Sequence, residues 1–222
     1  MTTIAMHKPH ADRGMEGIVA KWYAANTAEM MKEYIALARR TANELLQGSR
    51  VLEVAPGPGY FSIELAKLGK YAITGLDLSH TFVRIAAKKA LEAGVKVDFK
   101  QGSASKMPLQ CNQFDFLLCR AAFKNFADPV GALREMCRVL KPGGRGLIID
   151  LKRNASPREI SREVDGMGLT AVNRILTKLA FKTMLLKSAY TKEEFEQMLA
   201  QTEFSRVEIT ESALGFEISM TK

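Results

Sequence analysis

Apolar side chains recur at helical intervals early in the chain and then give way to a short unbroken run. Over residues 15–46, apolar positions follow one another every three or four residues, which predicts helix, and Asn26 and Glu29 within this range have the spacing of a capping box. Residues 51–55 are mostly apolar, too few for a helix, and are followed by a turn of two prolines and two glycines. We therefore predict a buried strand that enters a tight turn, and then a helix over residues 61–68.

The alternation of strand and helix continues through the middle of the chain. Short apolar runs typical of strands recur at residues 71–76, 95–100, 114–119 and 146–151. Helices are predicted between them, one from the capping residue Ser79 to Leu91 and one over residues 130–140. Strands that alternate with helices predict a parallel, doubly wound sheet that binds ligands at the carboxyl ends of its strands.

The chain after residue 151 departs from this alternation. Residues 152–190 are too many for a simple connection, and the apolar spacing at 172–186 predicts a helix within them. Thr191 is placed to cap a helix that runs through Leu199. The last pattern predicts two antiparallel strands, at residues 206–210 and 216–220.

Together these elements predict an α/β fold. Its core is a doubly wound, seven-stranded, mostly parallel sheet with a C-terminal antiparallel hairpin, N-terminal helices and a helical insertion after the fifth strand. We expect a single domain with four parts. These are an N-terminal helical cap (1–48), a ligand-binding core (49–151), a helical lid (152–190), and a closing helix and hairpin (191–222).

The composition is that of an ordinary globular chain. Of 222 residues, 47% are apolar and 25% are charged, which excludes wholesale disorder. Cys111, Cys119 and Cys137 are widely spaced, so we expect neither a disulfide framework nor a metal site, and a cytoplasmic location. No stretch approaches the roughly 18 consecutive apolar residues of a transmembrane helix.

The turn at residues 56–59 carries the first candidate chemistry. Its glycines allow a sharp bend and let a ligand come close to the backbone. No Gly-Lys-Ser/Thr follows, which excludes a P-loop, and Ser62 stands at the third glycine position of a dinucleotide-binding motif. The strand before the turn holds Glu53, which would repel a pyrophosphate and suits a ligand with an ammonium or sulfonium charge.

Asp77 is the second candidate, because it ends the second predicted strand 18 residues after Gly59. A carboxylate there can accept both hydroxyls of an adenosine ribose that lies across the first turn. Taken alone, the glycines could form an ordinary tight turn, and Asp77 could be an ordinary acid at the end of a strand. Together the two turns point to a nucleoside ligand.

Five segments, in order, resemble the motifs of the Rossmann-like (class I) S-adenosylmethionine-dependent methyltransferases. They read VLEVAPGPG (51–59), GLDLS (75–79), QGSA followed by MPL (101–109), FDFLLCR (114–120) and LREMCRVLKPGG (133–144). The resemblance covers about residues 50–151, and the closing hairpin also fits it. It implies S-adenosyl-L-methionine as the methyl donor and S-adenosyl-L-homocysteine as the product.

The resemblance also implies a cofactor site built from the ends of the predicted strands. Its residues toward the methionine portion are Glu53, Ala55, Gly57, Gly59 and, through its backbone, Arg120. Its residues toward the nucleoside are Asp77, Leu78, Ser103 and Ala104. Glu53 would hold the ammonium group and Asp77 the ribose. Relatives often carry Asp at the position of Ser103, so we expect a weaker contact to the adenine here.

Candidates for catalysis are few. Methyl transfer is an in-line displacement, for which positioning can supply much of the rate. Relatives often carry a histidine pair where this chain has Lys124 and Asn125, so the usual candidate base is missing. Tyr23 either reaches the cofactor from an N-terminal helix or packs in the core. Lys124 either steers an anionic acceptor or, the reading we favour, is a solvated charge. In the lid, Phe181, Met184 and Leu185 either line an apolar acceptor pocket or pack the lid itself.

The leading hypothesis is a methyltransferase with a small-molecule acceptor. A formal charge of +8 keeps an RNA or DNA methyltransferase as an alternative, and a non-catalytic S-adenosylmethionine-binding partner module is another. An NAD-dependent dehydrogenase is a distant fourth. Residues 152–190 hold eight Lys and Arg against three acids, which is +5 of the +8. Because the charge sits on the lid, we expect an anionic or apolar acceptor and no nucleic-acid groove.

Overall fold

The computed structural model describes residues 14–26, 31–166, 174–175, 178–179 and 186–222. Its helices are α1 (Gly17–Asn26), α2 (Met31–Glu44), α3 (Tyr60–Leu68), α4 (His80–Glu92), the 3₁₀ turn η2 (Phe123–Asn125), α5 (Pro129–Val139), α6 (Pro157–Gly166) and α8 (Lys192–Leu199). Its strands are β1 (Arg50–Val54), β2 (Ala72–Asp77), β3 (Asp98–Gln101), β4 (Phe114–Arg120), β5 (Leu140–Leu151), β6 (Arg206–Glu211) and β7 (Gly215–Thr221).

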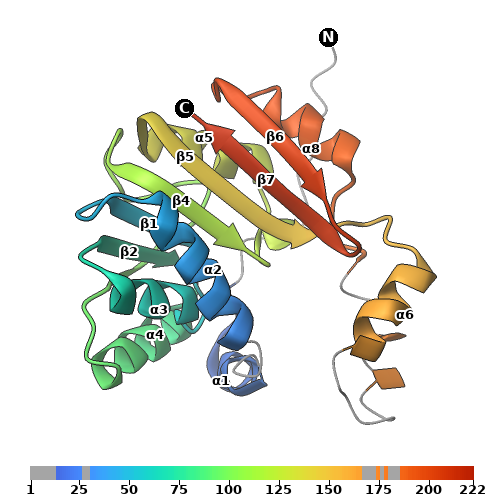
Figure 1. The fold of residues 1–222 in the computed structure, drawn as a ribbon, viewed down its shortest axis with the longest axis horizontal. Coiled ribbons are helices and arrows are strands. Elements are labelled where there is room, and N and C mark those ends of the chain that lie inside the picture. Colours follow the sequence, from blue (N-terminus) through green and yellow to red (C-terminus); the bar gives the residue numbers. More distant parts are fainter. Residues whose placement is uncertain (1–13, 27–30, 167–173, 176–177, 180–185) are drawn as a thin grey trace.

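The strands form one seven-stranded sheet in the order β3-β2-β1-β4-β5-β7-β6 (Figure 1). The first five strands are parallel, and β7 pairs antiparallel with both β5 and β6. The predicted fold class and its terminal hairpin are therefore confirmed. The order reverses between β1 and β4, and doubly wound sheets bind ligands at such a point, beyond the carboxyl ends of the strands. We call that side of the sheet the carboxyl edge.

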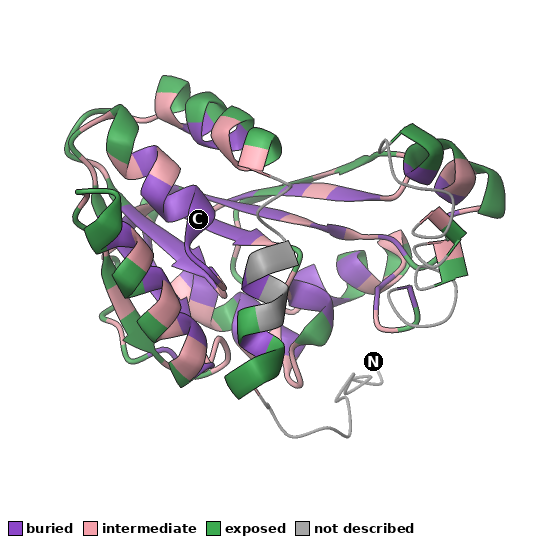
Figure 2. Cartoon of the chain, turned by 90° about the horizontal axis from the view of Figure 1, so that it is seen from below, coloured by how far each residue is buried: buried purple, intermediate pink, exposed green. Residues whose placement is uncertain are grey.

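Helices cover both faces of the sheet, and its central strands are largely buried, whereas the edge strands β3 and β6 are largely exposed (Figure 2). On one face α2 and α3 contribute Leu37 and Phe61 to a core that includes Val51 of β1. On the other face α5 and α8 contribute to a larger core, which includes Leu52 of β1. Neighbouring residues of β1 point to opposite faces, as the pleat of a strand requires. Burial on both faces explains why the strand sequences are continuous apolar runs.

The helical range predicted at residues 15–46 contains two helices, α1 and α2, which agrees with the predicted N-terminal helices. The two helices pack against different partners: Ala20 and Ala24 of α1 meet Phe82 of α4, whereas Leu37 of α2 joins the core over α3. Among the helices that the structure describes, none has both the length and the apolar character needed to cross a membrane.

Two strands begin at other residues than the apolar pattern predicts. β3 starts at Asp98 instead of residue 95, because the Val95 amide still bonds to the last turn of α4, at Ala90 O. β5 starts at Leu140 instead of residue 146, because Leu140 pairs with Phe114 across a register shift and extends the strand through the predicted turn. The first difference comes from a local bond at the end of α4, and the second from a strand partner that is distant in sequence.

The helix caps agree with the predictions where the structure describes them. The Ser79 hydroxyl accepts the Phe82 amide at the start of α4, and Thr191 forms a capping box with Glu194 at the start of α8. The insertion opens with α6. The helix predicted over residues 172–186 lies largely outside the described residues.

The segment around α1 is fastened to the carboxyl edge of the sheet. The Ser79 hydroxyl donates to Met15 O at 2.6 Å, and the carboxylate of Glu16 accepts the backbone amides of His80 and Thr81 at 2.9 and 3.0 Å. An acidic side chain at the first amides of a helix is favourable, so Glu16 serves α4 as a cap from another segment. These bonds place α1 beside the turns that follow β1 and β2.

Candidate functional site

The first turn has the backbone of a ligand-binding loop. Ala55, Gly57 and Gly59 all have positive φ angles, of 55°, 54° and 77°. A Cβ at Gly59 would lie 2.7 Å from Phe99 Cζ and 2.9 Å from Ala86 Cβ, so only glycine fits there. At Gly57, by contrast, an added Cβ would meet nothing within 4 Å, which leaves that side of the turn open. Strained backbone of this kind is concentrated at functional sites.

Asp77 joins the first and second turns. Its Oδ2 accepts the Gly57 amide at 2.9 Å and its Oδ1 accepts the Ser79 amide at 2.8 Å. Burial raises the pKa of Asp77, and the two amide bonds oppose that rise. The carboxylate is thus fixed between the turn after β1 and the start of α4, where the sequence analysis expects the ribose.

Glu53 is a buried carboxylate with no cation bonded to it among the described residues. Its Oε2 accepts the Ser62 amide at 3.1 Å and the Ser62 hydroxyl at 2.5 Å, and only 3% of the residue is exposed. Burial raises the pKa of Glu53 to about 7, while the bonds from Ser62 and the nearby charge of Arg120 act in the other direction. A buried carboxylate held by neutral donors is an incomplete ion pair, which a cationic group of a ligand would complete.

The end of β4 brings Arg120 to the same place. Ala121, which follows it, has a positive φ of 56°, and its amide bonds to Ile149 O at 2.7 Å. The Arg120 guanidinium pairs with Glu33 of α2 and lies over the ring of Tyr34, with its Cζ 4.4 Å from the ring centroid. Sequence reasoning assigned this residue a role through its backbone only. The side-chain contacts depend on α2, whose position no local motif reveals.

The predicted adenine side is more open. Leu78, Ser103 and Ala104 are half-buried, and the Ser103 and Ser105 hydroxyls are 3.1 Å apart. The Ser105 amide also donates to Ser103 Oγ at 3.3 Å. The third loop thus folds onto itself around Ser103, next to the end of β3. All of the predicted cofactor residues except Tyr23 therefore lie at the carboxyl ends of β1, β2 and β4 or in the turns that follow β1, β2 and β3.

This geometry agrees with what the chain is similar to. A sequence model for the methyltransferase domain matches residues 52–148, which span β1 to β5. We call residues 52–148 the methyltransferase domain, after the family model that they match. The match confirms that the motifs are those of a methyltransferase, as their resemblance implies.

The curated proteins that are similar to this chain include named methyltransferases. The chain is 38% identical over 121 residues to a demethylmenaquinone methyltransferase of Deinococcus radiodurans, covering 53% of this chain and 50% of the relative. It is 35% identical over 109 residues to a ubiquinone biosynthesis O-methyltransferase of Xanthomonas oryzae pv. oryzae, covering 49% and 45%. The chain thus spans about half the length of the curated relatives it matches.

The fold extends beyond the matched domain. A crystal structure from Methanococcus maripaludis, of a candidate S-adenosyl-L-methionine-dependent methyltransferase, superposes with a TM-score of 0.78 over 97% of each chain. Its sequence identity is 23%, so this likeness concerns the fold. It shows that the parts outside the methyltransferase domain, including the closing hairpin, also follow the arrangement of a known structure.

Tyr23 and the apolar lid residues are less well placed. Tyr23 lies within α1, but its side chain is outside the described part of the structure, as are Phe181, Met184 and Leu185. The helix that carries Tyr23 does reach the first turn, because the Tyr60 hydroxyl donates to Ala24 O at 2.6 Å. The position of the Tyr23 hydroxyl stays a prediction.

Lys124 is not the solvated charge that we favoured. Its ammonium donates to Asp150 Oδ1 at 2.9 Å and to Ala121 O at 2.7 Å, and its side chain is 8% exposed. The Lys124 amide also donates to Asp150 Oδ2. The structure therefore corrects that interpretation: Lys124 forms a buried ion pair within the methyltransferase domain. Sequence reasoning missed Asp150, although it is an acid near the end of a predicted strand, as Asp77 is.

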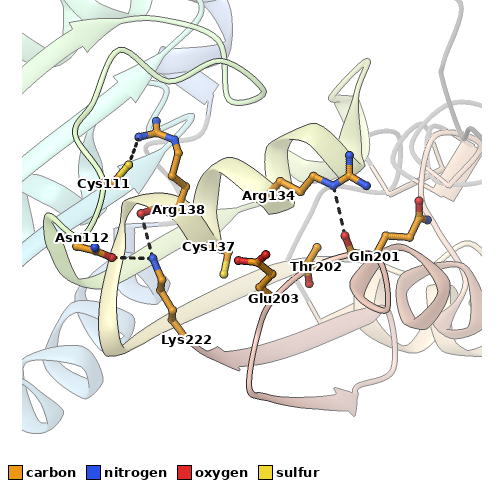
Figure 3. A pocket seen from close by; sticks show the side chains of 9 residues that line it. All are labelled: Cys111, Asn112, Arg134, Cys137, Arg138, Gln201, Thr202, Glu203 and Lys222. Carbon is orange, nitrogen blue, oxygen red and sulfur yellow. Dashed lines mark hydrogen bonds between the residues drawn. The ribbon is translucent and has the colours of Figure 1, made fainter.

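A separate cavity of about 450 Å³ lies at the opposite edge of the sheet (Figure 3). Its lining includes Cys111 and Asn112, which precede β4, Arg138 of α5 and Lys222 at the end of the chain. Lys222 Nζ donates to Asn112 Oδ1 at 2.7 Å, and Arg138 to Cys111 Sγ at 3.3 Å, so its polar groups bond to each other. Because it lies at the amino ends of the parallel strands, this cavity is not the site of the methyltransferase domain.

Proposed function

We propose that the chain is an S-adenosyl-L-methionine-dependent methyltransferase that acts on a small-molecule acceptor of the quinone type. The observation that carries the proposal is Glu53, a buried carboxylate beside the Gly57 turn without a bonded cation among the described residues. The amino-acid portion of S-adenosylmethionine brings an ammonium group to such a site. A dinucleotide would bring a pyrophosphate, which Glu53 would repel.

The residues of the carboxyl edge fit this cofactor. Glu53 would hold the ammonium group, Asp77 the ribose hydroxyls, and Ala55, Gly57 and Gly59 the backbone side of the methionine portion. Leu78, Ser103 and Ala104 would surround the adenine, as the motifs imply, and S-adenosyl-L-homocysteine would be the product. When bound, the cofactor supplies a methyl group activated by its sulfonium charge.

The chain's own contribution to the reaction would be positioning. Lys124 is held by Asp150, so it is not a free base, and we propose that the site aligns and desolvates the acceptor. Tyr23 stays a candidate for a contact to the cofactor.

We further propose the division into a helical cap (1–48), a cofactor-binding core (49–151), a lid (152–190) and a closing helix and hairpin (191–222). Cys111, Cys119 and Cys137 are unpaired, which supports a cytoplasmic location.

The quinone-type acceptor is proposed from the names of the curated relatives and from the apolar character of the lid. The positive charge of the lid is weaker support for an anionic acceptor than the charge count of residues 152–190 indicates. Several of its cations are paired with acids: Lys152 with Glu159, Arg153 with Glu194, and both Arg174 and Lys178 with Asp165. The same pairing removes the main reason for a nucleic-acid substrate, because paired charges attract phosphates weakly.

The test is methyl transfer from S-adenosylmethionine carrying a labelled methyl group to demethylmenaquinone. We expect label in the organic extract and a product heavier by one methyl group. Asp77→Ala should weaken the binding of S-adenosylhomocysteine by about 1.5–3 kcal/mol, through the loss of charged hydrogen bonds. Asp115→Ala is the matched control. Asp115 also accepts a backbone amide, from Arg50, but it lies near the amino end of β4, away from the carboxyl edge. Stabilisation against thermal unfolding by NAD and not by S-adenosylhomocysteine would overturn the proposal.

A further inference from the structure

The two terminal nitrogens of the Arg120 guanidinium differ in their hydrogen bonding among the described residues. Its Nη2 donates to Glu33, and its plane lies over the ring of Tyr34. Its Nη1 is buried and has no hydrogen-bond partner among the described residues. Buried polar groups are nearly always hydrogen-bonded, and a buried cationic donor without an acceptor is destabilising. An arginine held in place with one donor unpaired is therefore what an anion-binding position looks like before the anion is present.

The surroundings of Arg120 identify the part of the site that it serves. The ring of Tyr34 lies 5.5 Å from that of Tyr60, centroid to centroid, and Tyr60 directly follows Gly59 of the first turn. The charge of Arg120 also acts on the buried carboxylate of Glu53. The arginine is thus beside the turn and the acid to which the methionine portion is assigned, and Glu33 and Tyr34 hold it from the side of α2.

We propose that Nη1 of Arg120 binds the α-carboxylate of the cofactor's amino-acid portion, opposite Glu53, which takes the α-ammonium group. This inference rests on the proposed function and adds to it a residue that acts through its side chain. An α-amino acid carries one positive and one negative group on neighbouring atoms. Among the described residues, Glu53 has no bonded cation and Nη1 of Arg120 has no acceptor, so the two side chains together match that pair of charges.

The alternative anion for Arg120 is an anionic group of the methyl acceptor. The position beside Glu53 and the first turn favours the cofactor. Two ligands separate the sources: S-adenosylhomocysteine, and S-adenosyl-3-thiopropylamine, which is the same molecule without the carboxylate. Both keep the nucleoside and the amine, so the ratio of their affinities measures the carboxylate contact alone.

The test is calorimetric titration of the full chain and its variants with both ligands at pH 7.5. We expect the unaltered protein to bind S-adenosylhomocysteine roughly 10- to 100-fold more tightly than the amine analogue, the range expected for a charged hydrogen bond. Arg120→Met should abolish most of that preference and change the affinity for the analogue by less than about threefold. Retained binding of the analogue shows that the variant is folded. Arg120→Lys should keep part of the preference, because an ammonium group can still donate.

Arg145→Met is the matched control. Arg145 of β5 pairs with Glu44 of α2 as Arg120 of β4 pairs with Glu33 of α2, but Arg145 lies at the opposite edge of the sheet. This variant should keep the full preference.

Three results would overturn the proposal. Equal affinity of the unaltered protein for both ligands would overturn the assignment of Arg120 to the carboxylate and would leave the proposed function intact. An Arg120→Met variant that keeps the preference, and only raises the KM for the acceptor, would assign the arginine to the acceptor instead. Failure of the unaltered protein to bind either ligand would overturn the proposed function and this inference together.

Discussion

Two buried carboxylates occupy the same position on two strands and have different surroundings. Glu53 is the last residue but one of β1, and Asp150 is the last but one of β5. They are 3% and 5% exposed. Asp150 is bonded to the ammonium group of Lys124 and to the amides of Lys124 and Leu151. Among the described residues, Glu53 is bonded only to the amide and hydroxyl of Ser62.

The difference shows how one sheet separates structure from function. At Asp150 the chain supplies the compensating cation itself, so the carboxylate ties η2 to β5 and has little capacity left for a ligand. At Glu53 no described residue supplies a bonded cation, and burial raises the pKa of the acid to about 7. A buried acid whose pKa is raised in this way marks a binding site better than a buried ion pair does.

The largest expected effect comes from breaking the pair at Asp150. Lys124→Met should lower the free energy of unfolding by about 3–5 kcal/mol, because it leaves a buried carboxylate without its cation. At pH 4.5, where the folded chain keeps Glu53 protonated, Glu53→Gln should change the same quantity by less than about 1 kcal/mol, since no ion pair is lost and the amide oxygen can still accept from Ser62. Urea unfolding of both variants measures the two values.

The double variant Lys124→Met with Asp150→Leu is the control for this prediction. It should recover much of the lost stability, because replacing a whole buried pair by apolar side chains is often neutral. A loss of less than about 1 kcal/mol in Lys124→Met alone would show that the pair is not a structural tie.

The second effect is a pH dependence that only Glu53 should produce. Its pKa is about 7 in the folded chain and near 4.5 when exposed. Between these values the folded state keeps a proton that the unfolded state has released, so the free energy of unfolding should fall as pH rises. The fall should amount to about 3 kcal/mol between pH 4.5 and 8. It should be absent from Glu53→Gln, measured as the difference between the two pH profiles; parallel profiles would contradict the assignment.

Ligand binding should expose the same titration. An ammonium group placed at Glu53 favours the charged carboxylate, so S-adenosylhomocysteine should bind more tightly at pH 8 than at pH 6. Binding at pH 6 should release close to one proton, which calorimetry in two buffers of different ionisation enthalpy can count. Glu53→Gln should release none through this group.

The smallest effect compares two glycines instead of two acids. Gly57 and Gly48 both have positive φ angles, 54° and 86°, and open space where a Cβ would be. Changing either to alanine should cost about 1 kcal/mol of stability, from the left-handed backbone. Only Gly57→Ala should also weaken S-adenosylhomocysteine binding, because the new methyl group would occupy the side of the turn that faces the ligand. Equal affinities of the two variants would contradict that placement.

Much of the fold follows from local sequence. The strand at 51–55, the turn after it and the helix at 61–68 are predicted within one residue of β1 and α3, because burial on both faces demands continuous apolar runs. The hairpin of β6 and β7 is predicted equally well from its alternation. Glu53 and Asp77 stand out for the same local reason, as acids at the ends of apolar strands.

Long-range partners explain what the patterns missed. Pairing of Leu140 with Phe114 lengthens β5 at its start. The two N-terminal helices pack against different helices, α1 against α4 and α2 against α3. Lys124 looks like a surface charge in the sequence, and only its approach to Asp150, 26 positions later, makes it a buried one.

Sequence alone thus determined the order of the elements, the glycine turns and the acids that face a ligand, since each depends on residues that are neighbours in the chain. Tertiary structure decided which of the charges are paired. Compensation of a buried charge requires contact within hydrogen-bond distance, and the partners of Asp150 and Arg120 come from other elements of the fold. That pairing, which no motif encodes, leaves Glu53 without a bonded cation and one nitrogen of Arg120 without an acceptor among the residues that the structure describes at the carboxyl edge.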